Sequence, residues 1–353
     1  MNLYNQEGLP VHLGRTIRYY GGKAKLNGFI TESLTSVGMR PGMSILDAFS
    51  GTSIVSQAFK SYGLQTTAND HLYFCYALAD AHLSLNSEPK FLKLPQGPNT
   101  LSQLNRLPGK IDFITRNYSP YGKCQRMYLS IDNAKKVDAI RIQIESWKNS
   151  NLLTVTEFNY LVATLIYAIN LVSNVTGTYG AYLKFWENRS TKPLTLEPIR
   201  IFNNHHKNRA LNLDALEVVK RPFDLMYFDP PYNSRGYFSN YFLLELIAKG
   251  WFENTPILSG ITGQPKSLEV KSDFSSKKEV IGAFQRLIGR ANAPMIALSY
   301  NNEGLLPHDR LVSILSDFGK IKTFTRDHKR YRSINQDGTN ANTREVLITV
   351  RKK

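Results

Sequence analysis

The feature of the sequence that most limits its fold is a pair of apolar runs, each followed by a helical stretch. Residues 43–49 form an apolar run that ends at a polar turn, and residues 52–62 place apolar side chains on one helical face. Residues 64–68 form a second run, which precedes a helical stretch over 71–85. Strands that alternate with helices in this way lie parallel in one sheet. The sequence therefore predicts an α/β fold.

The middle of the chain interrupts this alternation. Residues 88–205 contain a stretch rich in Pro, Gly, Asn and Ser, and then two helical patterns at 134–147 and 156–171. We interpret this part as an inserted, mainly helical module. Residues 1–87 and 206–353 would then form one larger domain around the sheet.

The alternation resumes in the C-terminal half. Residues 223–228 and 294–300 are apolar runs of strand length. Residues 253–275 contain Gly, Pro and Lys without a clear period, and they predict a loop. Residues 320–326 and 345–351 could form an antiparallel pair that closes the sheet.

The charge of the chain indicates a polyanionic partner. Its 353 residues include 44 Lys and Arg against 28 Asp and Glu, which gives a net charge of +16. Such an excess favours a nucleic acid. The surface of an acidic membrane is the other candidate, and it ranks lower because no basic amphipathic helix with an aromatic face stands out.

The remaining composition excludes several classes. The two cysteines, Cys75 and Cys124, lie far apart and match neither a disulfide framework nor a zinc cluster, so no metal is expected. Residues 1–10 lack the apolar core of a signal peptide, and the longest apolar run, 160–175, is interrupted by Asn170. We therefore expect a soluble, cytoplasmic protein without a membrane partner.

Polar residues at the strand ends are candidates for a site, because ligands of open α/β sheets bind beyond the carboxyl ends of the strands. The first strand runs into Asp47, and Gly51 in the next turn permits close backbone approach to a ligand. The turn is not the G-x-G-x-x-G pattern of dinucleotide sites, and a zwitterionic amino-acid ligand suits it better than a pyrophosphate. Asp70, after the second strand, is placed to accept hydrogen bonds from a ribose diol. The alternative is that Asp70 caps the following helix.

Four features in one order make the chain resemble a known enzyme family. They are Tyr20-Gly21-Gly22-Lys23-x-Lys25-Leu26, Asp47-x-Phe49-x-Gly51-Thr52, the insertion, and Asp229-Pro230-Pro231-Tyr232. In this order they are similar to the Dam-like, alpha-class DNA adenine-N6 methyltransferases. Two further stretches resemble the bacterial enzymes of restriction–modification systems, namely Asn174-x-x-Gly177-Thr178-Tyr179-Gly180-Ala181-Tyr182-Leu183-Lys184 and Ser299-Tyr300-Asn301-x-Glu303-Gly304. The resemblance covers nearly the whole chain. It implies a Rossmann-like sheet that binds S-adenosylmethionine, with the insertion as a target-recognition domain.

The resemblance also assigns residues to this cofactor. Tyr20, Gly21 and Lys23 would border its methionine end. Asp70 would bind its ribose and Asp214 its adenine, although Asp214 by itself is as readily a helix cap. The main cradle would consist of Asp47, Phe49, Ser50, Gly51 and Thr52.

Catalysis is assigned to Asp229, Pro230, Pro231 and Tyr232. The lone pair of adenine N6 is delocalised into the ring, so the amine is a poor nucleophile. Asp229 and the Pro230 carbonyl can each accept one N6 hydrogen, and the Asp229 charge offsets the charge that develops on nitrogen. The prolines restrict the loop, and Tyr232 offers a ring on which the base can stack. Transfer would be direct, without a covalent enzyme intermediate or a metal.

Double-stranded DNA is the implied partner, and the target adenine must be flipped out of the base stack. Tyr331, within a basic stretch, is the candidate for a second stacking platform, and a solvated basic hairpin is the alternative. The insertion interleaves basic and aromatic residues, and the basic ones would contact phosphates. The candidates for DNA contact are Arg116, Lys123, Arg126, Lys184 and Arg189, accompanied by Tyr118, Tyr121, Tyr179, Tyr182 and Lys192. A cognate restriction endonuclease would be a functional partner and not a physical one.

Two alternatives stay open. The first keeps the enzyme class but changes the substrate to N4 of cytosine, an RNA or a protein glutamine. The family pattern places Asp first for adenine, so Asp229 speaks against it. The second is a non-catalytic DNA-binding protein of the same fold, and the intact Asp229, Gly51 and Lys23 speak against that.

Overall fold

The computed structural model describes residues 16–19, 21–231, 237–266, 272–301, 304–329 and 342–353. Three of the predicted site residues, Tyr20, Tyr232 and Tyr331, lie outside these ranges. The roles expected of these three tyrosines stay predictions.

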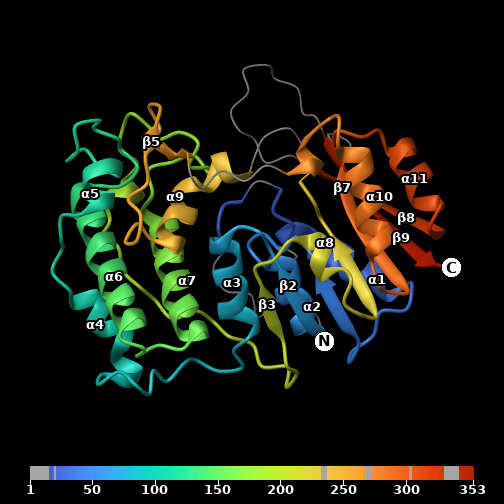
Figure 1. The fold of residues 1–353 in the computed structure, drawn as a ribbon, viewed down its shortest axis with the longest axis horizontal. Helices are drawn as coiled ribbons and strands as arrows, with labels where there is room; N and C mark the ends of the chain where they lie inside the picture. The colour runs from blue at the N-terminus through green and yellow to red at the C-terminus, as the bar shows by residue number, and fades with distance from the viewer. Residues whose placement is uncertain (1–15, 20, 232–236, 267–271, 302–303, 330–341) are drawn as a thin grey trace.

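A seven-stranded sheet with the order β3-β2-β1-β4-β7-β9-β8 carries the site (Figure 1). The first five strands of this order pair in parallel, and β9 enters antiparallel between β7 and β8. The α/β fold with its closing antiparallel pair is thereby confirmed, while the short strand β3 has no counterpart in the sequence analysis. The strands are β1 (Ser44–Asp47), β2 (Gln65–Asn69), β3 (Arg209–Leu211), β4 (Leu225–Phe228), β7 (Met295–Asn301), β8 (Gly319–Lys329) and β9 (Asn342–Lys352).

Helices cover both faces of the sheet. Successive strand residues point to opposite faces, and Ile45 and Leu225 pack in one cluster with α1 and α2. Leu46 and Met226, the next residue in each strand, pack in the opposite cluster with α10 and α11. A parallel sheet covered in this way leaves its strand ends as the place for a ligand. The covering helices are α1 (Asn27–Thr35), α2 (Ile54–Ser61), α10 (Val280–Arg290) and α11 (His308–Ser316).

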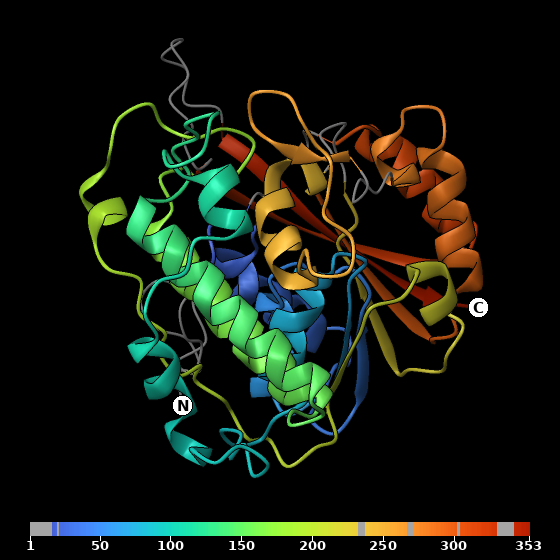
Figure 2. The same cartoon turned by 60° about the vertical axis from the view of Figure 1, so that its left-hand side comes forward.

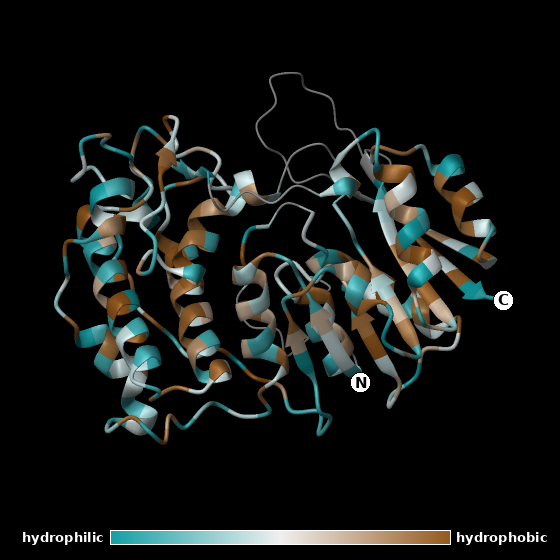
Figure 3. Ribbon diagram, viewed as in Figure 1, coloured by the Kyte–Doolittle hydropathy of each residue, from teal (hydrophilic) through white to brown (hydrophobic). Residues whose placement is uncertain are grey.

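A lobe of helices lies beside the sheet (Figures 1 and 2). Its core is continuous with the sheet domain, because one apolar cluster includes Leu78 of α3, Ile166 of α7 and Phe242 of α9. Figure 3 shows apolar residues along these helices as well as along the strands. The helices are α3 (Tyr73–Leu83), α4 (Thr100–Arg106), α5 (Phe113–Tyr118), α6 (Ile131–Asn149), α7 (Val155–Val172) and α9 (Tyr237–Lys249). Of these, α9 lies beyond the insertion predicted at 88–205, yet it packs inside the same core.

Helix α7 is the central helix of this lobe. Thr154 and Glu157 form a reciprocal capping box at its start, in which each side chain accepts a hydrogen bond from the other residue's backbone N–H. It is also the one helix in the described ranges that is long and apolar enough to cross a membrane by length and composition. Most of it is buried inside the protein, as is usual for a core helix.

The stretch predicted as a loop, residues 253–275, contains regular structure. β5 (Leu258–Ser259) and β6 (Gln264–Pro265) form a hairpin, and η5 (Asp273–Ser275) is a single turn of 3₁₀ helix. The prediction of a loop fits most of the described residues of this stretch but misses these short elements, because strands of two residues are too short to produce a period in the sequence.

Candidate active site

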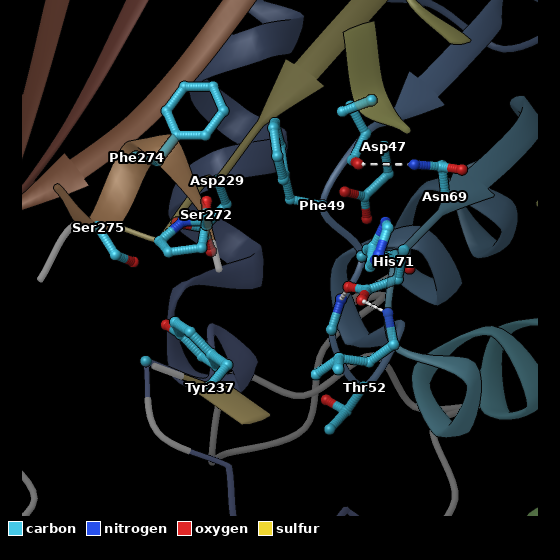
Figure 4. A pocket seen from close by; sticks show the side chains of 18 of the residues that line it. Asp47, Phe49, Thr52, Asn69, His71, Asp229, Tyr237, Ser272, Phe274 and Ser275 are labelled. Carbon is cyan, nitrogen blue, oxygen red and sulfur yellow. Dashed lines mark hydrogen bonds between the residues drawn. The ribbon is translucent and has the colours of Figure 1, made fainter. Parts of the chain in front are cut away.

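A cavity of about 660 Å³ opens at the carboxyl ends of β1 and β4. The chain order reverses here, since β1 pairs with β2 on one side and with β4 on the other. Eleven predicted residues meet at this cavity, and the buried Pro230 adjoins them. Figure 4 labels Asp47, Phe49, Thr52 and Asp229 among them. The eleven are Gly21, Lys23, Asp47, Phe49, Ser50, Gly51, Thr52, Asp70, Asp214, Asp229 and Pro231.

The turn after β1 presents polar atoms that have no protein partner in the described part of the chain. One carboxylate oxygen of Asp47 accepts from the Ser56 hydroxyl at 2.5 Å, while its Oδ1 and the Ser50 hydroxyl are buried without a hydrogen bond. Burial raises the pKa of Asp47 to about 7 against the opposing bond from Ser56, and the charges of Asp229 and Asp70 add to the increase. Such a site favours a ligand that brings a cation or hydrogen-bond donors.

Gly51 holds a backbone conformation that other residues rarely adopt. Its φ is +49°, and a Cβ at this position would lie 3.0 Å from Cε1 of Tyr19. The Tyr19 ring is itself fixed by stacking on Tyr241, with 4.6 Å between the ring centroids. Tyr19 is a wall of the cavity that the sequence analysis missed, because an aromatic residue before a glycine motif carries no signal of its own.

Asp70 and Asp214 both border the cavity, and Asp214 also caps a helix. Asp70 accepts from the backbone N–H of Gly51 at 2.8 Å and of Leu72 at 2.9 Å, so it ties the loop after β1 to the loop after β2. Burial raises the pKa of Asp70 to about 7, although these two hydrogen bonds oppose the increase. Asp214 accepts from the backbone N–H of Leu216 at 2.7 Å, at the start of α8 (Ala215–Val218). The capping alternative is therefore present at Asp214. It is absent at Asp70, because the N-cap of α3 is Leu72 and has no side-chain cap.

Lys23 is shared between two carboxylates. Its ammonium is 2% exposed and lies 3.3 Å from Asp229, and 3.4 and 3.5 Å from the two oxygens of Glu345. Burial raises the pKa of Asp229 to about 6. The Lys23 charge lowers this pKa, and the Glu345 charge raises it. Glu345 reaches the site because β9 pairs with β7, where it lies opposite Asn301. The sequence of residues 345–351 predicts a strand, but nothing in it links this buried acid to the site.

Two further segments complete the walls. Phe274 from η5 meets Phe49 edge-to-face with 5.4 Å between the ring centroids, and Phe49 contacts Phe228 of β4 in the same manner at 6.4 Å. In Figure 4, Phe274, Ser272 and Ser275 lie on one side of Phe49, and Asp47 and Asn69 lie on the other. Tyr237, at the start of α9, also lines the cavity. These segments were not predicted from the sequence, because they join the site only through the tertiary fold.

The residues predicted to contact DNA differ in their exposure. Arg116, Lys123 and Lys184 are exposed, as are Tyr121 and Lys192. Tyr118 and Tyr179 are buried in the core of the helical lobe, and Tyr182 packs against that core.

Two of the predicted arginines are committed to the protein. Arg126 is 5% exposed and donates to the backbone carbonyls of Asn117, Gly260 and Ile261. Arg189 pairs with Glu187 at 2.5 Å and donates to the carbonyl of Val175. The geometry of Arg126 does not fit the phosphate contact expected of it, because each of its three nitrogens donates to a backbone carbonyl and its side chain is buried.

The sequence of this chain is similar to a family of DNA methyltransferases and to several of its members. A family model described as "D12 class N6 adenine-specific DNA methyltransferase" matches residues 19–314. The chain is 40% identical over 326 residues to the type II methyltransferase M.FokI of Planomicrobium okeanokoites, covering 90% of this chain and 50% of that protein. It is also 40% identical over 346 residues to the modification methylase StsI of Streptococcus sanguinis, covering 96% and 52%. The type II methyltransferase M.NlaIII of Neisseria lactamica is 33% identical over 330 residues, covering 92% of this chain and 95% of that protein. The chain thus spans about half the length of M.FokI and StsI.

Proposed function

The chain belongs to the D12 class N6 adenine-specific DNA methyltransferases, and on that basis we propose that it transfers a methyl group from S-adenosylmethionine to N6 of an adenine in duplex DNA. One observation carries the proposal. Asp229 and Pro230 follow the buried strand β4 directly, and Asp229 opens onto a cavity whose other polar groups come from the end of β1. Hydrogen-bond acceptors on a rigid strand end are what the exocyclic amine of a base requires.

The cavity residues fit S-adenosylmethionine. Membership of a methyltransferase family implies a methyl donor, and this donor would supply an electrophilic methyl group on a positively charged sulfur. The unpartnered Asp47 Oδ1 and Ser50 hydroxyl would accept or donate hydrogen bonds to its polar groups. Gly51 would allow its close approach to the backbone, and Phe49 with Phe274 offers an apolar surface to its adenine. Gly21, Thr52, Asp70 and Asp214 line the same space.

In the proposed mechanism Asp229 works as an ionised carboxylate. It accepts one hydrogen of the adenine amine, and the Pro230 carbonyl accepts the other, so that the nitrogen lone pair points at the methyl group. Burial raises the pKa of Asp229, and the Lys23 charge 3.3 Å away limits the net value to about 6, so the ionised form predominates near neutral pH. Tyr232 and Tyr331 remain our candidates for stacking on the flipped base.

The helical lobe is proposed to hold the DNA. Arg116, Lys123 and Lys184 are exposed there and can reach phosphates. Arg189 could join them only by giving up part of its contact with Glu187. We keep residues 88–205 as the proposed target-recognition module, supported by its helical content and its basic surface residues.

The biological role we propose is protection of host DNA in a restriction–modification system. M.FokI, StsI and M.NlaIII are named as type II or modification methylases, and the chain covers 95% of M.NlaIII. A cognate endonuclease would then be a functional partner that reads the same site. The cytoplasm is the expected location, because DNA is the substrate.

A methyl-transfer assay tests the function. The purified protein is incubated with S-adenosylmethionine carrying a labelled methyl group and with mixed-sequence duplex DNA, and the digested nucleosides are separated by mass spectrometry. We expect label in N6-methyladenine. Label in N4-methylcytosine, transfer to RNA alone, or DNA binding without any transfer would each contradict the proposal.

A further inference from the structure

We propose that the β5–β6 hairpin, residues 257–266, is an apolar wedge that inserts into the base stack of duplex DNA beside the target adenine. The inference rests on the proposed function and deepens it. It assigns a DNA contact to a segment that lies outside the predicted reading module at 88–205.

The hairpin exposes two isoleucines. Ile257 is 78% exposed, and Ile261, in the connection between the two short strands, is 83% exposed. A single exposed apolar side chain is ordinary. Two on one short hairpin are unusual, because turns normally carry polar residues that water can solvate. In the isolated protein these two side chains are exposed to water and contribute little hydrophobic stabilisation.

Buried side chains hold the tip of the hairpin in place. Arg126 donates from Nε to the carbonyl of Ile261 at 2.8 Å and from Nη2 to that of Gly260 at 3.2 Å. The hydroxyl of Tyr118, which is fully buried, donates to the carbonyl of Gly263 at 2.7 Å. Burying an arginine is costly unless its donors are satisfied. Here the buried cation stabilises a tip whose own side chain points away from the core.

The backbone of the tip is adapted to this anchor. Gly263 has a φ of +74°, and a Cβ at this position would lie 2.7 Å from Cζ of Arg126. The ladder is closed by the bond from the Lys266 N–H to the Ile257 carbonyl at 3.3 Å. A segment fixed in this way loses little conformational entropy on binding, which is the property of a preorganised contact.

The path of the chain joins the hairpin to the cavity at both ends. Tyr237, in the first turn of α9, lines the cavity, and β6 packs on this helix. The chain then forms the hairpin and returns to the cavity wall at Ser272. In Figure 1, β5 lies at the edge of the helical lobe near α5. The hairpin is therefore joined at both of its ends to segments that line the cavity, so DNA bound by the hairpin would be held on the cavity side of the molecule.

The charge around the hairpin favours DNA as the occupant. Arg116 and Lys123 are exposed on the segment that anchors the tip, and Lys266 is exposed on the hairpin itself. Residues 113–130 and 257–266 contain no Asp or Glu. Positive charge beside an exposed apolar side chain is typical of proteins that contact phosphates and insert an apolar side chain between base pairs.

The test compares two exposed side chains on substrates that differ in base pairing. The recognition site is first mapped by methylation-sensitive sequencing of DNA from cells that express the protein. Ile261→Ser is then compared with Leu92→Ser, because Leu92 is 84% exposed on a different segment. Methyl transfer is measured on a fully paired duplex and on one whose target adenine lies opposite a mismatch. Calorimetry measures S-adenosylmethionine affinity for all proteins.

A wedge lowers the cost of extruding a paired base, and this cost is small for a mispaired one. We expect Ile261→Ser to lose roughly tenfold or more in rate on the paired duplex, because the wedge no longer offsets the cost of unstacking, and to recover most of the loss on the mismatched one. Leu92→Ser and all cofactor affinities should stay close to wild type. Equal rates for the two variants on paired DNA overturn the wedge, and so does an equal loss by Ile261→Ser on both duplexes. If the wild-type protein methylates no DNA, the proposed function itself is wrong.

Discussion

The ammonium of Lys23 lies 3.3 Å from the carboxylate of Asp229, inside the protein, at the position where the transfer is proposed to occur. The same ammonium is held by Glu345 from β9. Two carboxylates thus share one cation, and the protonation of Asp229 depends on both neighbours.

The pH dependence of the reaction should follow this arrangement. If the ionised form of Asp229 is active, the acid limb of the rate profile lies near its pKa of about 6. Glu345→Gln removes a negative charge and should move the limb to lower pH, whereas Lys23→Met removes the cation and should move it to higher pH. Single-turnover methyl transfer measured over roughly pH 5 to 8 checks this. An acid limb that stays in place in both variants would show that Asp229 is not the titrating group.

Replacement of Asp229, the proposed catalytic carboxylate, should lower turnover without lowering DNA binding. Asp229→Asn should lower the rate of transfer by roughly 100-fold or more, the loss typical for one preorganised charge in a site, while DNA affinity stays near wild type. The matched control is Asp224→Asn at the other end of the β4 region, where the exposed Asp224 accepts from the N–H and hydroxyl of Ser44. Asp224→Asn should retain its turnover. Comparable turnover of Asp229→Asn and wild type would refute the assigned role.

Two glycines should respond oppositely to alanine. Gly51→Ala forces a Cβ to 3.0 Å from Tyr19 at a φ of +49°, and we expect it to destabilise the fold by about 1–2 kcal/mol and to weaken cofactor binding. Gly28→Ala in α1 meets no atom within 4 Å, and we expect a neutral effect or stabilisation by roughly 0.5–1 kcal/mol. Urea unfolding and calorimetric titration measure both effects. Unimpaired cofactor binding by Gly51→Ala would place the ligand elsewhere.

Stability of the ligand-free protein should fall as the pH rises from about 4 to 7. Burial raises the pKa of Asp47 and Asp70 from 3.8 to about 7, so in this interval the folded state binds more protons than the unfolded state. Stability contributed by the protonated forms is present at low pH and is lost as these groups ionise. The thermal midpoint, followed at constant ionic strength, should decrease over this range, and Asp47→Asn should flatten the slope. A slope that is the same in wild type and Asp47→Asn would contradict the assignment.

The central strands and their ends could be predicted from the sequence. The apolar runs at 43–49 and 223–228 contain β1 and β4, and an acid marks the end of each strand: Asp47 is the last residue of β1, and Asp229 follows β4. The apolar pattern of each run and the position of its acid were therefore enough to predict the two strand ends, at β1 and β4, that form the cavity. The same reasoning found α6 and α7, whose apolar faces repeat over many turns.

The remaining walls depend on contacts between distant segments, which local patterns do not encode. Glu345 reaches Lys23 only because β9 inserts beside β7, and Phe274 reaches Phe49 only after the chain returns from the hairpin. Arg126 shows a related limit. In the sequence, an arginine among aromatic residues indicates an exposed residue that contacts DNA. In the structure, three backbone carbonyls accept hydrogen bonds from Arg126, and this allows the side chain to be buried.

The continuous core between α3, α7 and α9 has a consequence for engineering. Specificity in modular enzymes is often changed by exchanging a whole domain as a cassette. Here a cut at either end of residues 88–205 would divide one apolar cluster, since Leu78 and Phe242 lie outside the cut and Ile166 lies within it. Each transplanted half would present unmatched apolar surface to its new host, with the cavity and overpacking costs of a mismatched core. New sequence preferences are therefore better sought by substitutions on the exposed rim of the lobe, which leave that core intact.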